Sequence, residues 1–177
     1  MKILFIVGSL RKDSFNGLLA KHLVKIANED GVDTELADVN LPIFNQDEYK
    51  TPDPRVKAFR EKIANADGVV IVSPEYNRSI PGPVKNALDW TAWQVENFWK
   101  DKKVALAGAT PSMLGTALAQ TDLRKVLSFV GAKVMVQPEL FIPFAMKQFD
   151  QAGNVSSEEE TFLTNWVENL QKFIAEK

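Results

Sequence analysis

The chain has no cysteine and only one histidine among its 177 residues. The lack of cysteine excludes disulfides, thiol redox chemistry and thiolate metal sites. With a single histidine as well, a transition-metal centre is not expected. The chain also lacks long runs of like charge. Its 21 basic and 23 acidic residues are mixed along the sequence, and the longest run of one sign is the acidic stretch 158–160. A basic face that binds nucleic acid is therefore not expected.

Long apolar runs are missing too. The first apolar stretch, residues 3–7, is too short for a membrane span or for the core of a signal peptide. We therefore expect a soluble, cytoplasmic protein with no membrane partner. The remaining composition, 45% hydrophobic and 25% charged, is that of a globular protein. The length predicts a single domain over residues 1–177, large enough for one substantial core.

Short apolar runs alternate with helical patterns along the chain. Strands are predicted at residues 3–7, 34–39, 69–72, 104–107 and 133–136, and helices at 15–26, 55–65, 83–90, 118–130 and 156–174. This alternation predicts an α/β fold: a parallel sheet with right-handed crossovers and helices on both faces. Two long irregular regions, 41–54 and 138–154, are expected to be functional or to lie at an interface.

The loop after the first strand, residues 8–16 (GSLRKDSFN), suits a phosphate. Loops at the carboxyl ends of strands line the ligand crevice of an open α/β sheet. Ser9, Ser14 and Asn16 offer hydrogen-bond donors, and the positive end of the following helix adds to them. Arg11 adds a bidentate, charge-assisted contact. The single glycine before the helix fits neither a dinucleotide fingerprint nor a Walker A loop. From these residues alone, Ser14 as a mere helix cap beside a solvated Arg11 is an equal alternative.

The loop after the third strand, residues 73–82, suits a flat heterocycle. Glu75, Tyr76 and Asn77 supply a carboxylate, an aromatic ring and an amide, and two prolines stiffen the loop. A rigid loop edge offers backbone N–H and C=O groups to the pyrimidine edge of a flavin, and Tyr76 is suited to wall the pocket. The alternative that the residues leave open is a plain turn that caps the next helix.

Both loops resemble motifs of the NAD(P)H-dependent FMN reductase family. Residues 8–16 are similar to the family's G-S-x-R-x-x-S-x-N phosphate loop. Residues 73–90, SPEYNRSIPGPVKNALDW, are similar to its P-E-Y-N-x-S-x-P-G-x-x-K-N-A-x-D-W segment. The resemblance extends over nearly the whole chain. It implies a flavodoxin-like three-layer sandwich with a five-stranded parallel sheet of order 2-1-3-4-5, and assembly as a homodimer or homotetramer.

The resemblance also implies the cofactor and the reaction. FMN would be bound, and NADPH or NADH would donate electrons in a ping-pong hydride transfer to flavin, quinone, azo or chromate acceptors. No catalytic side chain is assigned, because the cofactor carries the chemistry. The implied phosphate contacts are Ser9, Arg11, Ser14 and Asn16, with a backbone contact from Phe15. Pro74, Glu75, Tyr76 and Asn77 would frame the isoalloxazine ring.

One segment departs from the family. After the fourth strand the family has a serine-containing loop that ends in Gly-Gly, whereas residues 109–116 read ATPSMLGT, with Thr116 in place of the second glycine. Ser112 is still expected to contact the flavin. Two other functions stay open at this point: a flavodoxin-type electron carrier and a non-catalytic flavin-binding module. A carrier of that type is usually strongly acidic, whereas the net charge here is −2.

Overall fold

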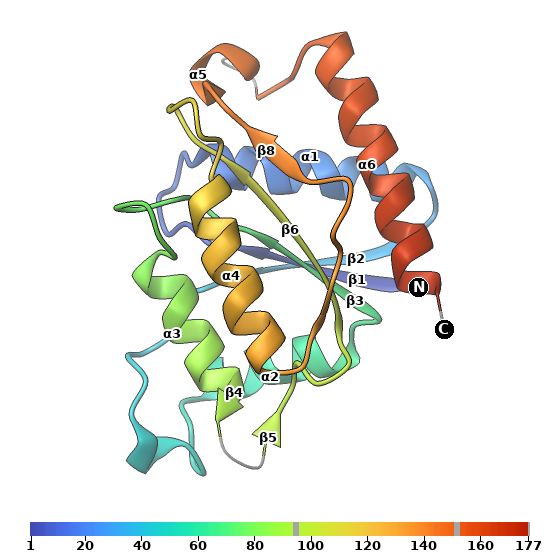
Figure 1. Cartoon of the computed structure of the whole chain (residues 1–177). Helices are drawn as coiled ribbons and strands as arrows, with labels where there is room; N and C mark the ends of the chain where they lie inside the picture. Colours follow the sequence, from blue (N-terminus) through green and yellow to red (C-terminus); the bar gives the residue numbers. More distant parts are fainter. Residues whose placement is uncertain (94–95, 151–152, 177) are drawn as a thin grey trace.

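The protein has a central parallel sheet, seen in a computed structural model that describes residues 1–93, 96–150 and 153–176. The strands run in the order β2-β1-β3-β6-β7, and β8 also pairs with β6 (Figure 1). Numbered along the chain, this is the predicted order 2-1-3-4-5, so the parallel α/β fold is confirmed. The strands are β1 (Lys2–Val7), β2 (Asp33–Asp38), β3 (Gly68–Val72), β6 (Lys103–Ala109), β7 (Lys133–Val134) and β8 (Leu140–Ile142).

The fifth strand differs from the prediction. It was expected over residues 133–136, but β7 pairs only with Lys103 and Val104 and ends at Val134. The same edge resumes at β8, which pairs with Ala107–Ala109 of β6. Pro138 lies in the gap between the two strands. Six positions separate Val134 from Leu140, but only three separate their partners Val104 and Ala107, so the segment that contains Pro138 leaves the ladder between β7 and β8.

Helices cover both faces of the sheet. They are α1 (Phe15–Glu29), α2 (Pro54–Asn65), α3 (Gly82–Thr91), α4 (Ala117–Phe129), the short α5 (Ala145–Gln148), α6 (Ser157–Ala175) and the 3₁₀ turn η1 (Gln46–Glu48). Successive strand residues point to opposite faces. Accordingly, Phe5 packs in a buried cluster with α1 and α6, whereas Leu4 and Ile6 pack in another with α2, α3 and α4. These are the three layers that were predicted. None of the described helices is long and apolar enough to cross a membrane.

The irregular region 41–54 is fastened to α3. Pro42 C=O accepts hydrogen bonds from Trp90 Nε1 (2.7 Å) and Asn86 Nδ2 (2.9 Å). Beneath it, the buried Arg60 donates to the Trp90 and Tyr49 carbonyls and lies 4.1 Å from the centre of the Tyr49 ring. A two-stranded hairpin, β4 (Ala92–Trp93) and β5 (Glu96–Asn97), follows α3 and was not predicted. These contacts order the long loop without drawing it into the cofactor crevice.

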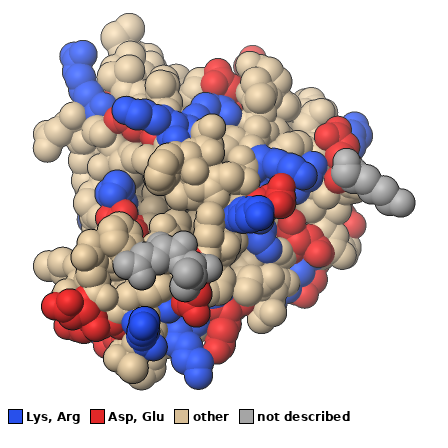
Figure 2. All heavy atoms as spheres, turned by 60° about the horizontal axis from the view of Figure 1, so that its bottom comes forward, with Lys and Arg blue, Asp and Glu red and all other residues tan. Residues whose placement is uncertain are grey.

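Charges of both signs are interspersed on the face shown in Figure 2. An ion-paired group joins β1, β2 and α2. The Glu35 carboxylate accepts from Lys2 Nζ (2.9 Å) and Lys62 Nζ (3.0 Å). The hydrogen bonds from these two ammonium groups hold the pKa of Glu35 below its ordinary value of 4.5, and the one from Lys2 has the larger effect.

Candidate cofactor site

The two loops singled out in the sequence begin side by side at the carboxyl edge of the sheet. Val7 of β1 is in register with Val72 of β3, and Gly8 N donates to Val72 C=O at 2.8 Å. The chain passes from β1 outward to β2 and then back across to β3, so the strand order reverses between β1 and β3 (Figure 1). Ligands of open α/β sheets bind at this kind of switch point.

Two glycines allow the strand ends to approach so closely. A Cβ on Gly8 would lie 2.7 Å from Val84 Cγ2 and 3.1 Å from Ser73 Cα. A Cβ on Gly108 would lie 2.5 Å from Ser73 C=O and would also overlap the Thr116 hydroxyl. Any larger residue at either position would therefore push apart the strand ends that carry the loops.

A cavity of about 130 Å³ lies where the loops meet. Eight of the predicted site residues line it, whereas Asn77 and Ser112 do not. The last residue of β6 and the loop after it contribute three lining residues, none of which was a predicted contact. The lining consists of Ser9, Arg11, Ser14, Phe15, Asn16, Pro74, Glu75, Tyr76, Ala109, Thr110 and Pro111.

The phosphate end of the cavity is rich in donors. Ser14 caps α1, since its Oγ accepts from Asn16 N at 3.2 Å, and its own hydroxyl hydrogen remains free to donate. Arg11 Nη2 donates to Asp13 C=O at 2.6 Å, which leaves the other N–H groups of this exposed guanidinium for a ligand. The first N–H groups of a helix have no partner within it, and α1 has no acidic residue in its first turn. This donor set fits a phosphate dianion, so the capping and binding alternatives for Ser14 are compatible.

The side chain of Asn16 is occupied elsewhere. Its Nδ2 donates to Ala109 C=O at 2.9 Å, and its Oδ1 accepts from Ala109 N at 3.0 Å. Both residues are buried. The amide thus ties the start of α1 to the end of β6. Because the Asn16 N–H is also the donor of the Ser14 cap, the predicted contact between Asn16 and phosphate stays a prediction.

The ring end is formed by a tight turn. Tyr76 and Ser79 exchange backbone hydrogen bonds of 3.2 and 3.1 Å across Asn77 and Arg78. Both central residues have positive φ, 51° and 60°, as a two-residue type I′ turn requires. Tyr76 lines the cavity and is 47% exposed, which leaves its ring accessible to a ligand. Asn77 lies at the turn itself, outside the lining, so its predicted flavin contact stays a prediction.

Glu75 fastens this loop to a helix. Its Oε2 accepts from Leu118 N and Ala119 N of α4, both at 3.0 Å. Thr116, the N-cap residue of α4, makes no side-chain capping bond, and the first turn of α4 has no acidic residue. Ser79 Oγ adds a second link, a hydrogen bond of 2.5 Å to Asp122. The Glu75 carboxylate therefore caps α4. In this loop, contacts with a flavin ring would come from the backbone and not from the Glu75 side chain.

The departing segment has its own geometry. Ser112 is exposed, and its N–H donates to Thr110 Oγ1 at 3.3 Å. Thr110 and Pro111 form this wall of the cavity instead. Thr116 has φ of 76°, a left-handed conformation that favours the glycine of the family. The predicted contact of Ser112 with flavin is thus not supported by its place outside the lining, and remains a prediction.

A parallel sheet of order 2-1-3-4-5, with helices on both faces and its switch point between the first and third strands, is the flavodoxin-like fold. The chain matches the NADPH-dependent FMN reductase family over residues 1–147 and belongs to that family. The resemblance in the two loops predicted this membership, which is confirmed. The protein is accordingly an oxidoreductase with FMN as cofactor and NAD(P)H as electron donor.

Individual relatives agree with this assignment. A 2-hydroxy-1,4-benzoquinone reductase from Burkholderia is 41% identical over 176 residues, which cover 94% of each chain. A quinone reductase from Escherichia coli K12 is 36% identical over 88% of this chain and 85% of its own. The structure of FerB, a flavoenzyme NAD(P)H:(acceptor) oxidoreductase from Paracoccus denitrificans, superimposes with a TM-score of 0.89 at 36% identity, covering 98% of this chain and 96% of its own. A Bacillus cereus flavodoxin, 15% identical with a TM-score of 0.66, shares only the fold.

Proposed function

We propose that this protein reduces quinones with electrons from NADPH or NADH, through FMN bound at the crevice between β1 and β3. The observation that carries the proposal is the convergence of a phosphate-binding loop and a Pro-Glu-Tyr-Asn loop on one cavity. Relatives named as quinone reductases, one of them 41% identical, favour a quinone as the acceptor. Other flat acceptors, such as free flavins and azo compounds, fit the same open face.

The residues of the site have binding and positioning roles in this proposal. Ser9, Arg11 and Ser14 hold the phosphate together with the backbone at the start of α1. The turn at Tyr76 borders the ring and leaves one side open to donor and acceptor. When bound, FMN supplies the hydride chemistry of the reaction. The Glu75 carboxylate is bonded to α4, so no side chain is assigned as a general acid or base.

Because donor and acceptor would use the same open face, we propose a ping-pong order. The test is steady-state oxidation of NADPH and NADH by the FMN-loaded protein at several concentrations of 1,4-benzoquinone. Parallel double-reciprocal lines are expected, with turnover well above that of free FMN at the same concentration. Intersecting lines would refute the shared face. FMN binding without turnover would instead indicate an electron carrier or a non-catalytic module, and failure to bind FMN would overturn the proposal.

We further propose a cytoplasmic homodimer or homotetramer built from one FMN-binding domain, residues 1–177. Phe129 of α4 is 90% exposed and borders an apolar groove with Trp93 and Val126. Burial of such a patch favours self-association. Phe129→Glu is expected to lower the molar mass measured by light scattering, while Phe162→Glu, on the exposed side of α6, leaves it unchanged. A wild-type protein that is monomeric at micromolar concentration would contradict the assembly.

A further inference from the structure

A second, larger cavity continues from the phosphate loop on the side away from the ring site. Its volume is about 620 Å³, within the range of about 300–1,000 Å³ that small-molecule sites occupy. It shares Ser9, Arg11 and Ser14 with the cavity assigned to the flavin. A molecule whose phosphate sits in the loop can therefore extend into this space.

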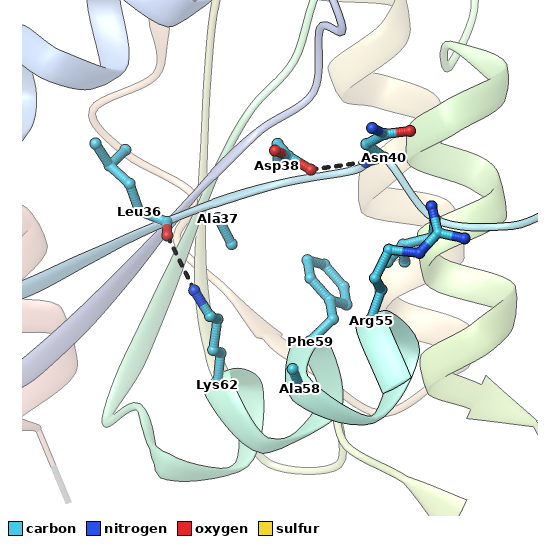
Figure 3. Close-up of a pocket in the computed structure, with 9 residues that line it drawn as sticks. Leu36, Ala37, Asp38, Asn40, Arg55, Ala58, Phe59 and Lys62 are labelled. Atoms are coloured by element: carbon cyan, nitrogen blue, oxygen red, sulfur yellow. Dashed lines mark hydrogen bonds between the residues drawn. The ribbon is translucent and has the colours of Figure 1, made fainter. Parts of the chain in front are cut away.

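The walls of this cavity come from one βαβ unit. The first turns of α1 contribute Gly17, Leu18 and Lys21, and the carboxyl half of β2 contributes Leu36 and Asp38. Leu36 and Asp38 lie two residues apart on an edge strand and so face the same side. Figure 3 shows Leu36 and Ala37 pointing to opposite sides of β2. Leu36 is 40% exposed, so its apolar side chain is accessible to a ligand in this cavity.

The polar groups of this cavity are available to a ligand. Lys12 and Lys21 are exposed and form no ion pair with any residue of the described chain. Asp38 Oδ1 accepts from Asn40 N at 2.9 Å, and among the described residues no donor contacts its second carboxylate oxygen. The cations beside the phosphate loop suit a second phosphate group. The carboxylate at the end of the second strand suits the hydroxyl groups of a ribose.

The position of the carboxylate has a structural reason. In a βαβ unit the carboxyl ends of both strands meet at the same sheet edge. An acid at the end of the second strand, about 20 residues after the phosphate loop, then reaches the ribose of an adenosine. Asp38 follows Asn16, the end of the phosphate loop, by 22 residues and is the last residue of β2. The chain lacks the glycine fingerprint of dinucleotide-binding folds, but it has the acidic residue at the end of the second strand.

The cavity on the other side of β2 provides a contrast. It shares Leu36, Ala37 and Asp38 of β2 with the cavity beside α1, and its other lining residues include Phe59, Arg55 and Lys62 (Figure 3). Its cations are already paired: Arg55 with Asp53 at 3.0 Å, and Lys62 with Glu35 at 3.0 Å. Of these two cavities, the one beside α1 adds unpaired cations and continuity with the phosphate loop to the Asp38 carboxylate that both share.

We infer that the cavity between α1 and β2 binds an adenylate moiety, with Lys21 at its phosphate, Asp38 at its ribose and Leu36 against its base. This inference rests on the proposed FMN site. The same chemistry has two sources: the AMP half of FAD, whose flavin half occupies the ring site, and the adenylate half of NADH or NADPH. The two sources differ in whether the adenylate is attached to the flavin.

The first arm of the test compares FMN and FAD by isothermal titration of the apoprotein. If FAD is the source, it binds at least as tightly as FMN, and Lys21→Gln and Asp38→Ala each weaken FAD five- to tenfold but FMN less than twofold. Lys25→Gln is the matched control, because Lys25 lies one turn further along α1 and outside the cavity. It is expected to change neither affinity.

The second arm measures KM for NADH and NADPH with the FMN-loaded protein. If the nicotinamide dinucleotide is the source, Asp38→Ala raises KM five- to tenfold, while the FAD-to-FMN affinity ratio stays that of the wild type. The inference is overturned if neither the ratio nor KM moves more than twofold, or if FMN and FAD weaken equally. If the protein binds FMN and oxidises NADH but the variants change neither the affinity ratio nor KM, the adenylate site alone is refuted. Protein that binds no flavin refutes the proposed function as well.

Discussion

Replacing Asn16 with alanine tests the link between the start of α1 and the end of β6. The substitution removes two hydrogen bonds and leaves both the N–H and the C=O of Ala109 without their partner. Asn16 is 3% exposed and Ala109 is 2% exposed, so water does not readily replace the amide. A buried polar group left unsatisfied costs about 1–3 kcal/mol. For the two groups together, we therefore expect the free energy of unfolding to fall by about 2–6 kcal/mol, and Tm by roughly 4–24 °C.

The assay is urea denaturation of the apoprotein, followed by FMN titration of the folded variant. Asn16→Asp is the informative partner, because it keeps the acceptor for Ala109 N but has no donor for Ala109 C=O. It should lose stability as well, and it should weaken FMN further because it adds a negative charge beside the phosphate. In the apoprotein Ser14→Ala removes the α1 cap and should cost about 1 kcal/mol of stability. A loss below about 1 kcal/mol in Asn16→Ala would refute the reasoning that the amide satisfies two otherwise orphaned groups.

Three further outcomes are expected. Arg11→Ala should weaken FMN roughly tenfold or more, since a hydrogen bond to a charged group contributes about 1.5–3 kcal/mol; riboflavin, which lacks the phosphate, should bind the variant and the wild type equally. Glu75→Ala should destabilise the protein by about 1 kcal/mol through loss of the α4 cap, and hydrogen exchange should increase at Leu118 and Ala119, whereas unchanged exchange there would contradict the capping role. Glu35 has a lowered pKa in the fold, so its contribution to stability is complete above pH 4.5 and is lost as the pH falls through the folded value. Glu35→Gln should thus cost at most about 1 kcal/mol at pH 7, and nothing at low pH, as measured by urea denaturation at both.

The sheet was predictable because each strand is a short apolar run between helical patterns. Residues 69–72 are buried on both faces, as a central parallel strand requires, and β3 occupies Gly68–Val72. The last helix was predicted from its cap, and Ser156 Oγ accepts from Glu159 N at 3.2 Å. The predicted fifth strand was wrong beyond Val134, because Met135 and Val136 have strand propensity but lie where the pairing with β6 shifts by three residues before β8.

The cavity was less predictable than the loops that form it. The loops follow from strand ends, a local property of the sequence. The partners of their side chains do not: Asn16 bonds to a residue 93 positions away, and Glu75 to one 43 positions away. Both side chains looked like ligand contacts, because an amide or a carboxylate in a loop at the sheet edge has the same local pattern whether it binds a ligand or another loop.

Thr116 shows why a departure from the family pattern has to be considered together with its neighbours. A β-branched residue in the left-handed conformation carries a cost of roughly 1–2 kcal/mol. Here its hydroxyl accepts from Gln120 Nε2 at 3.0 Å, and its side chain is fully buried against Gly108. Because a Cβ on Gly108 would overlap that hydroxyl, the threonine is possible only beside a glycine on β6. The substitution therefore shifts the requirement for a small residue from the loop to the strand.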